Sequence, residues 1–592
     1  MKYNQSIVWI MLSALFTFTA CEKDPFNGTD NYMLEFALQT AEGETFNGDI
    51  SDHLIQINIP SNRETDQLTA KYTVSEMATV SPNPETVKDW SSEQTFTVTS
   101  YNGTPRPYTV KVMKTDVIMS ESVYLRTDED VAAFAAKEIN IVNGNLIIGA
   151  PAGTDSISNI DALAGLKEVR YQIIINTTYK GIDLNGLRNL QKAGSLSIQG
   201  TFKQLTKIEL PALENIQSVL SISSEEITDI LLPQFNTAGN IRFILPKLEQ
   251  LNLEQLTSTK EVNIRSANRL KTIHLPSLVK ANLLHIEKCN TLESIQLPSL
   301  MNVEETLRIV HNSSLTDLSC INKIENAQRI EISSCPQLTS LKPVFGMLKT
   351  LGDLSVSDLP QIKDELDLSH VSIHGSVRII RCLHVSAILL PEKIGDTFEL
   401  NLASDESQTV LPHITGVAEC QNFQISNAPG IKEMVLPSSL KKIAKRLYLN
   451  GGILSVSGEN LQEAGDIRIS SNNLASISFP NLTKVTDKLS LFGKYLETIR
   501  LSKLTSVGEL EIGGSYSGWQ NEKLTNLDFL SSLTSVETLE IKFCKFLTDY
   551  SGLTKAVESG SITEKNWHAG SVHDNAYNPT YEDLKAGRYV KP

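Results

Sequence analysis

Four side chains between residues 370 and 384 are of the types that bind zinc. They are His370, His374, Cys382 and His384, and imidazole and thiolate groups are common zinc ligands. The segment alternates polar and apolar residues as a strand does, so strand alternation rather than the facing of helical residues decides where His370 and His374 point. This strand context argues against a zinc site, and we predict no metal ion and no cofactor.

Carboxylates are the second group that could do chemistry. A β-helix enzyme that cleaves polysaccharides needs paired acids, or a base with calcium-binding acids, at matching positions of adjacent turns. Several acids lie at turn positions, but they do not recur at the same position of successive turns. These acids are Asp364, Glu365, Asp367, Asp405 and Glu406. GxSxG, P-loop, Rossmann and HExxH patterns are also absent from the sequence. We therefore expect no enzyme, with a carbohydrate-active β-helix enzyme as the alternative.

Aromatic residues in one glycine-rich insertion are the best candidates for binding. The insertion reads GGSYSGWQNEK over residues 513–523 and contains Tyr516 and Trp519. Such side chains stack on sugars or anchor protein contacts. The alternative is that both rings fold back onto the neighbouring structure. We predict Tyr516 and Trp519 as ligand-binding residues.

The first 21 residues combine Lys2, an apolar run and the ending Thr19-Ala20-Cys21. Lys2 and the short apolar run are typical of a signal peptide rather than a membrane span. The ending resembles a bacterial lipobox, which implies cleavage after residue 20 and lipid on Cys21. We expect residues 1–20 to be the signal peptide and residues 21–31 to link the lipid anchor to the first domain. The alternative is an ordinary secretory signal.

Length and charge limit the remaining possibilities. With 592 residues, the chain is too long for one compact core, which predicts several domains or a repeat array. The formal charge of −15, without a basic block, argues against nucleic acid as a partner. We expect the cysteines after Cys21 to be buried free thiols. These six are Cys289, Cys320, Cys335, Cys382, Cys420 and Cys544.

Residues 32–114 alternate apolar and polar side chains over short runs, such as HLIQINIP at 53–60. Turn-rich pieces such as SPNPE at 81–85 separate the runs. This pattern predicts a small antiparallel β-sandwich with Trp90 in its core. The stretch around Asp89-Trp90-Ser91 resembles the Ig-like domains of Bacteroidetes surface lipoproteins. That resemblance implies a spacer between the membrane and the rest of the chain.

A Leu-Pro or similar apolar-Pro pair recurs in phase from residue 211 onward. Pro211 and Pro233 are 22 residues apart, as are Pro276 and Pro298. A fixed period of this length predicts a solenoid. Within one turn, the pairs Ile295/Leu297 and Leu307/Ile309 suit two short strands. Proline lacks an N–H donor, so Pro298 suits a corner between strands, with Leu297 and Leu300 in the core.

The repeated turns resemble the receptor L-domain and, in second place, the BspA-like leucine-rich repeats. The resemblance rests on LESIQLPSLMNVEETLRIV (292–310) and LNGLRNLQKAGSLSI (184–198), and for BspA on Cys289 and Cys335, each followed three residues later by leucine. It implies a right-handed β-solenoid over residues 115–557. We expect about 19 turns and a length of about 90 Å. A helix at 127–137 is expected to cap the front and residues 558–592 the back, although the aromatic tail could also bind a ligand.

Together these features predict a mainly β protein of the outer membrane, anchored by lipid on Cys21 and facing the cell exterior. We expect a non-catalytic role in binding or adhesion, with a host protein, a matrix protein or a glycan as the partner. A purely structural envelope protein is the remaining alternative. We interpret the repeat itself as a structural scaffold and expect the functional residues where the repeat is interrupted.

Overall fold

The computed structural model describes residues 26–514 and 520–592. The predicted lipidation site Cys21 and the predicted binding residues Tyr516 and Trp519 lie outside the described residues. The chain divides into two compact units, of which the first ends at Val117 and the second spans Ile118–Pro592. The protein is mainly β, as predicted, with 43% of residues in strands and 7% in helices.

The first unit is a seven-stranded β domain in the order β4-β1-β2-β3-β7-β6-β5. Its strands are β1 (Met33–Gln39), β2 (Thr45–Ser51), β3 (Leu54–Pro60), β4 (Thr69–Val74), β5 (Thr79–Ser81), β6 (Gln94–Thr99) and β7 (Pro105–Thr115). The prediction of a wholly antiparallel domain was wrong for one pair, because β3 and β7 run parallel. The long connection between them lets β7 return in the same direction, which a two-residue hairpin cannot do.

Trp90 lies in the core of this domain, as predicted. Its side chain is 1% exposed, and its indole N–H donates a hydrogen bond to the carbonyl oxygen of Leu68 at 3.0 Å. The ring also lies edge-on to Phe36 and at a tilt to Phe96. A buried indole needs both apolar neighbours and a partner for its N–H, and Trp90 has both.

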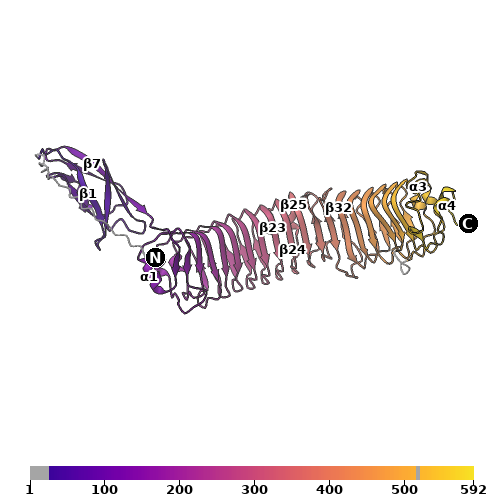
Figure 1. The fold of residues 1–592 in the computed structure, drawn as a ribbon. Coiled ribbons are helices and arrows are strands. Elements are labelled where there is room, and N and C mark those ends of the chain that lie inside the picture. The colour runs from indigo at the N-terminus through magenta and orange to yellow at the C-terminus, as the bar shows by residue number, and fades with distance from the viewer. Residues whose placement is uncertain (1–25, 515–519) are drawn as a thin grey trace, which may run out of the picture. The chain divides into compact units, whose positions relative to one another are not determined.

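The second unit is a parallel β-solenoid of about 17 turns, with successive strands stacked side by side (Figure 1). The long strands of its main sheet are β12 (Glu168–Ile175), β13 (Lys192–Gln199), β15 (Asn215–Ser223), β17 (Thr237–Ile244), β19 (Ser258–Arg265), β21 (Lys280–Glu287), β23 (Asn302–Val310), β24 (Asn326–Ser333), β25 (Thr350–Ser357), β32 (Glu419–Ala428), β34 (Lys442–Gly451), β36 (Glu463–Ser470), β38 (Lys484–Phe492), β40 (Ser506–Gly513) and β41 (Ser535–Lys542). The estimate of 19 turns was too high, because much of the stretch from residue 118 to 165 forms the cap rather than full turns.

Short strands form smaller parallel sheets on another side of the solenoid. They are β14 (Lys207–Glu209), β16 (Asp229–Leu231), β18 (Gln250–Asn252), β20 (Thr272–His274), β22 (Ser294–Gln296), β26 (Leu366–Asp367), β29 (Ala387–Leu389), β31 (His413–Thr415), β33 (Glu433–Val435), β35 (Ser455–Ser457), β37 (Ser476–Ser478) and β39 (Thr498–Arg500). The core lies between these strands and the main sheet.

The apolar-Pro motif forms a corner, as predicted. Pro298 lies in the turn directly after β22, and Leu297 and Leu300 on either side of it are fully buried. The Leu300 N–H donates to the Leu297 carbonyl at 3.1 Å and closes the turn. Proline is tolerated here because ladder bonding has stopped at this point. The motif therefore belongs to the scaffold.

The main sheet is interrupted near its middle. Between β25 and β32 the main sheet has only three shorter strands, β27 (Ser372–Ile373), β28 (Val377–Ile380) and β30 (Thr397–Asn401). β27 and β28 together take the place of one long strand, and both pair with β25. The ladder of backbone hydrogen bonds is thus shorter here than in the neighbouring turns, where strands run for eight residues or more.

A helix covers the N-terminal end of the solenoid, as predicted. Helix α1 (Asp128–Ala135) begins after Thr127, whose hydroxyl accepts a hydrogen bond from the Asp130 N–H, while the Asp130 carboxylate accepts one from the Thr127 N–H. This capping box satisfies two of the free N–H groups at the start of the helix. The short strands beside it are β8 (Ile118–Met119), β9 (Val123–Leu125), β10 (Ile141–Val142) and β11 (Leu146–Ile148).

Residues 551–592 extend past the last long strand. Strand β42 (Val572–His573) pairs with β41 and continues the main sheet. Trp567 is 2% exposed and donates its indole N–H to the Pro579 carbonyl at 2.8 Å, so its ring faces inward rather than toward a ligand. The helices here are α3 (Thr554–Glu558) and α4 (Tyr581–Lys585). The other short helices of the described chain are α2 (Lys342–Phe345) and the 3-10 helices at Pro84–Thr86, Asp161–Leu163, Asn185–Leu187, Asp528–Leu530 and Ser551–Leu553.

All six cysteines of the solenoid are free thiols, as predicted. Five of them are buried, and Cys320 is not, which corrects the expectation that all six would be core residues. Cys320 lies in a turn and is partly exposed. Among the described residues, none of the helices has both the length and the apolar character needed to cross a membrane.

Candidate ligand-binding surface

The buried residues of the long strands follow two different spacings, and this difference shapes the surface of the main sheet. In β23 the buried residues Val303 and Leu307 are four positions apart, whereas in β24 the buried residues Ala327 and Ile330 are three apart. Val303 pairs with Ala327 and Leu307 pairs with Ile330. β23 must therefore bulge outward by one residue between two positions that stay in register.

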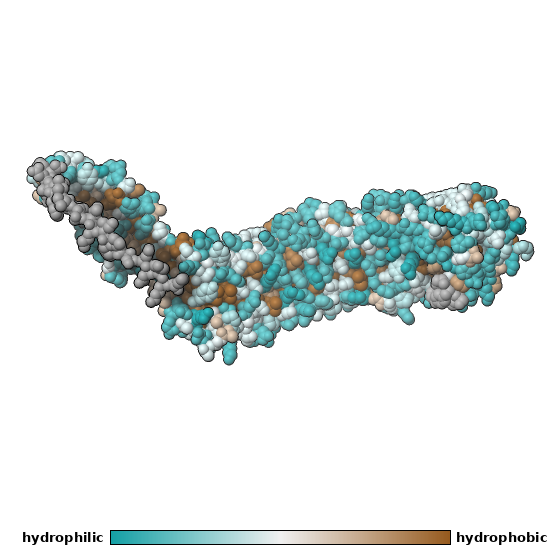
Figure 2. Space-filling model, in the orientation of Figure 1, coloured by the Kyte–Doolittle hydropathy of each residue, from teal (hydrophilic) through white to brown (hydrophobic). Residues whose placement is uncertain are grey.

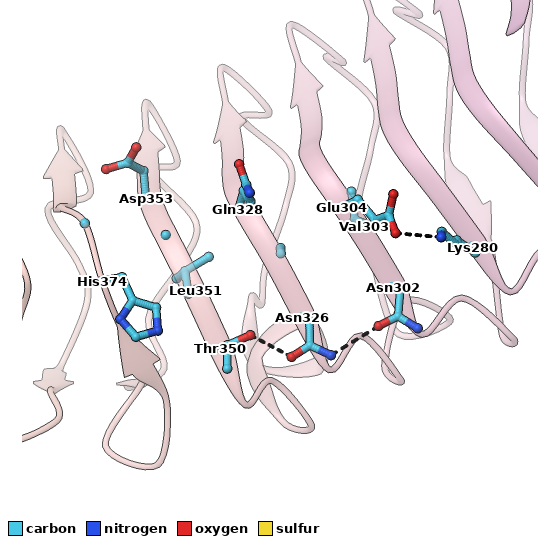
Figure 3. A pocket seen from close by; sticks show the side chains of 13 residues that line it. Lys280, Asn302, Val303, Glu304, Asn326, Gln328, Thr350, Leu351, Asp353 and His374 are labelled. Atoms are coloured by element: carbon cyan, nitrogen blue, oxygen red, sulfur yellow. Dashed lines mark hydrogen bonds and ion pairs between the residues drawn. The ribbon is translucent and has the colours of Figure 1, made fainter.

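A groove of about 800 Å³ lies over the main sheet beside this bulge (Figure 3). It crosses strands β21, β23, β24 and β25 and reaches the start of the interrupted region at Gly375. The groove is lined by Lys280, Asn302, Val303, Glu304, Asn326, Ala327, Gln328, Thr350, Leu351, Gly352, Asp353, His374 and Gly375. Seven of these thirteen residues have amide, hydroxyl or charged side chains, and none of the thirteen is Phe, Trp or Tyr.

A row of hydrogen-bonded side chains runs along one side of the groove. Asn302, Asn326 and Thr350 occupy equivalent positions of β23, β24 and β25. The Asn326 amide donates to Asn302 Oδ1 at 3.1 Å, and the Thr350 hydroxyl donates to Asn326 Oδ1 at 2.6 Å, as Figure 3 shows. The bonds hold the amides in a fixed orientation, so their remaining donors and acceptors point in defined directions.

The charged side chains of the groove are paired. Lys280 Nζ lies 2.6 Å from Glu304 Oε1 across neighbouring strands. Asp353 accepts a hydrogen bond from the Ser376 N–H at 2.9 Å and lies 3.3 Å from Arg329 Nη2. Because each charge has a nearby partner, the groove offers directional hydrogen bonds rather than a strong field of one sign.

Two glycines form part of the groove floor. A Cβ atom on Gly352 would come within 2.3 Å of the Gln328 carbonyl oxygen, and one on Gly375 within 2.7 Å of the Gly352 carbonyl oxygen. Both distances are shorter than real Cβ contacts, so any other residue would push the strands apart. The glycines let the backbone itself line the groove.

Wherever the pKa of a carboxyl group among the described residues departs from its ordinary value, it is lowered. The groups concerned are Asp89, Asp128, Glu261, Glu287, Asp358, Asp367, Asp405 and Asp583. A general acid in glycoside hydrolysis needs a raised pKa. For Asp367 and Asp405, hydrogen bonds from the serine two residues later cause the lowering.

The four candidate zinc ligands lie in different surroundings. His370 Nε2 lies 3.2 Å from the Phe345 carbonyl oxygen, and His374 lines the groove. Cys382 is buried, its Sγ lies 3.6 Å from the Ile380 carbonyl oxygen, and burial raises the pKa of its thiol to about 12. His384 is exposed. Within residues 26–514 and 520–592, no three His, Cys, Asp or Glu side chains gather as a metal site would require.

Three of the acids considered for catalysis accept hydrogen bonds from serine residues of the solenoid. Asp367 and Asp405 each accept hydrogen bonds from the N–H and the hydroxyl of the serine two residues later. Asp364 accepts a hydrogen bond from the Ser340 hydroxyl at 2.6 Å. The bonds of Asp367 and Asp405 stabilise their own turns, as Asp side chains commonly do. The bond of Asp364 instead joins two neighbouring turns of the solenoid.

A second groove of about 810 Å³ follows one corner of the solenoid. The corner residue of successive turns adopts a left-handed backbone conformation, with φ values between 53° and 57°. These residues are Ser266, Lys288, His311, Ser334, Asp358 and Arg381. Asp358 and Arg381 form a bidentate ion pair, in which Arg381 Nη2 lies 2.6 Å from Asp358 Oδ2. The pair occupies the charged end of the groove and leaves fewer free donors there.

Two comparisons with known proteins bear on the chain. Residues 33–112 match the family model described as SGBP, N-terminal, the N-terminal domain of surface glycan-binding proteins. The match covers the first unit and none of the solenoid. A search of curated proteins gave no match. The comparisons therefore support a binding role at the level of the first domain, whereas the Ig-like and leucine-rich resemblances stay predictions.

Sequence reasoning did not predict the groove. Its row of amides begins with the dipeptides Asn302-Val303 and Asn326-Ala327, which stand 24 residues apart. The available signal for the groove was a polar residue that stands directly before the first buried residue of successive strands. The groove also depends on the bulge in β23, and a bulge shows in the sequence only when the register with the next strand is known.

Proposed function

We propose that this protein is a surface glycan-binding protein whose solenoid holds a saccharide chain in the groove over β21–β25. The match of residues 33–112 to the N-terminal domain of surface glycan-binding proteins carries the proposal. The amide and hydroxyl lining of the groove supports it, because these groups match the donors and acceptors of sugar hydroxyls. Figure 2 shows that the visible face of the solenoid is mainly hydrophilic, with scattered apolar patches.

The dimensions of the groove suit a linear glycan that runs across the strands. Neighbouring strands of a sheet are about 4.8 Å apart, close to the advance of about 5 Å per pyranose unit in an extended chain. Equivalent side chains such as Asn302, Asn326 and Thr350 would then meet successive sugar units in the same way. The paired charges favour a neutral glycan over a strongly acidic one.

We propose a non-catalytic role in capture or adhesion. The pairing of Glu304 with Lys280 and of Asp353 with Arg329 supports binding without cleavage. The lipid anchor on Cys21, with display at the outer membrane surface, belongs to the same proposal. Its support is the lipobox-like sequence and the surface association of the family that the first domain matches.

Gln328 offers a direct test. It is exposed, lines the groove and lies at the centre of the β23–β25 surface. Isothermal titration of the full chain would use cellohexaose, xylohexaose, mannohexaose and maltohexaose. We expect one of these to bind, and Gln328→Ala to weaken its binding by about fivefold or more. Gln250→Ala, an exposed glutamine on the short strand β18, is the matched control and should leave binding unchanged.

Two outcomes would overturn the proposal. One is the absence of binding to every member of the panel. The other is binding that Gln328→Ala leaves unchanged. Release of shorter sugars from any of these oligosaccharides would instead favour the carbohydrate-active enzyme that the sequence left open.

A further inference from the structure

A second bulged strand carries an aromatic side chain at its apex. In β12 the buried residues Val169 and Ile173 are four positions apart, but their partners Ala193 and Leu196 in β13 are three apart. Tyr171 occupies the bulge, and 61% of its side chain is exposed. The other bulged strands have a small or charged residue at this position. These residues are Ser218 in β15, Glu305 in β23, Lys445 in β34 and Asp487 in β38.

A groove of about 390 Å³ lies beside Tyr171. It is lined by Asn143, Glu168, Val169, Arg170, Tyr171, Lys192, Ala193, Gly194 and Gln217. The volume is near the lower end of the range of about 300–1,000 Å³ for small-molecule sites. It suits one end or a short section of an oligosaccharide rather than a folded peptide.

Gly194 keeps this groove open. A Cβ atom on Gly194 would come within 2.3 Å of the Tyr171 carbonyl oxygen and 2.4 Å of the Arg170 carbonyl oxygen. The bulge pushes these two carbonyls toward β13, and only a residue without a side chain fits against them. The same glycine leaves backbone exposed at the groove floor, where a ligand can approach closely.

The polar groups around the tyrosine complete the chemistry of a sugar site. Asn143 and Gln217 supply amide donors and acceptors from strands or turns on either side of Tyr171. Arg170 Nε lies 3.3 Å from Glu168 Oε1, so this pair presents hydrogen-bonding groups with little net charge. An exposed aromatic ring beside amides and a neutralised ion pair matches a pyranose, which has an apolar face and polar edges.

We propose that the groove beside Tyr171 is a second saccharide-binding subsite, in which the tyrosine ring stacks on the apolar face of a neutral pyranose unit. The proposal rests on the glycan-binding function proposed above and adds a separate site at the N-terminal end of the solenoid. Both grooves lie on the main sheet beside a bulged strand. Six strand spacings of about 4.8 Å separate β12 from β23, or about 29 Å along the sheet.

The test measures binding of cellohexaose, xylohexaose, mannohexaose and maltohexaose to the full chain and to three variants. Tyr171→Ala removes the ring, and we expect it to weaken binding at one site by about tenfold or more. Tyr171→Phe keeps the stacking surface and should retain most of the affinity. Tyr495→Ala is the matched control, because Tyr495 is also exposed but lies far along the chain in the loop after β38. Circular dichroism spectra that match the wild type exclude misfolding as the cause.

The outcomes separate this proposal from the broader one. If the wild-type chain binds one of the oligosaccharides and Tyr171→Ala binds it equally well, the Tyr171 subsite is wrong while glycan binding stands. If Tyr171→Phe loses as much affinity as Tyr171→Ala, the stacking role is wrong. If the wild-type chain binds none of the four oligosaccharides, both proposals are overturned.

Discussion

Gly194 lies directly against the backbone of Tyr171, at a distance that admits no side chain. A Cβ atom on Gly194 would approach the Tyr171 carbonyl oxygen to 2.3 Å. The relationship recurs after other bulged strands, where a glycine of the next strand faces the displaced carbonyl. The glycines concerned are Gly239 after β15, Gly465 after β34 and Gly508 after β38. After β23 the equivalent position is Gln328, which lines the groove over β21–β25.

Replacing Gly194 with alanine should destabilise the solenoid. The added methyl group would force β12 and β13 apart, and overpacking of this kind costs about 1–3 kcal/mol. Denaturant unfolding of the full chain measures the change. Gly165→Ala is the matched control, because a Cβ at Gly165 meets nothing within 4 Å. Equal stability of the two variants would contradict the described packing of the bulge.

Thiol labelling should distinguish Cys320 from the other solenoid cysteines. Burial raises the pKa of the Cys289 and Cys335 thiols to about 11 and those of Cys382, Cys420 and Cys544 to about 12. At pH 8 these thiols stay protonated and shielded, and the thiolate is the reactive form. In a chain with Cys21 replaced by serine, a thiol reagent should label one site quickly. Cys320→Ser should abolish this fast phase, and several fast sites would show that the core thiols are accessible.

The C-terminal tail should loosen in acid. Asp583 accepts hydrogen bonds from the Thr580 hydroxyl and N–H and from Arg588, which lower the pKa of its carboxyl group to about 2 from an ordinary value of 3.8. Because the folded-state pKa is the lower one, the stabilisation is present above pH 3.8 and is lost as the pH falls toward 2. Pepsin cleavage within residues 581–592, normalised to a free peptide of the same sequence, should rise over this interval.

The variant Asp583→Asn provides the control for that experiment. Its tail should already be susceptible at pH 4, and its cleavage should depend less on pH than that of the wild type. A wild-type tail that resists pepsin equally at pH 4 and pH 2 would show that the Asp583 carboxylate does not hold helix α4 in place.

Lipid attachment at Cys21 is tested by metabolic labelling. Cells that express the full chain are grown with radiolabelled palmitate, and the protein is expected to carry label and to fractionate with the outer membrane. Cys21→Ala should lose the label and leave the membrane fraction, since the predicted acyl chains are then absent. Retention of palmitate label in the variant would show that lipid is attached to another residue.

The regular part of the fold was predictable because each turn repeats the same residue types at the same spacing. The corner at Pro298, the buried pair Leu297 and Leu300, and the cap at Thr127 all follow from residue types at fixed spacing, and all are confirmed. The parallel pairing of β3 and β7 was missed, because alternation marks a strand but not its direction or partner.

The candidate grooves were not predictable in the same way. Tyr171 and Gln328 line grooves only because of how the neighbouring strands pair with their own. The pairing register belongs to two strands and cannot be determined from one stretch of sequence. The spacing of buried residues, four in β12 against three in β13, was visible in the sequence as Val169–Ile173 and Ala193–Leu196. It indicates a bulge only once those four residues are known to be partners.

The interruption of the main sheet at β27, β28 and β30 has a consequence for how the solenoid comes apart. In a stack where each turn touches only its neighbours, cooperativity passes along the stack through the interfaces between turns. The shortest ladders are the weakest of these interfaces, so the solenoid should melt as two foldons that meet near residues 372–401. The groove over β21–β25 ends at this boundary, at His374 and Gly375. A saccharide bound there would contact turns at the boundary between the two foldons and couple their melting.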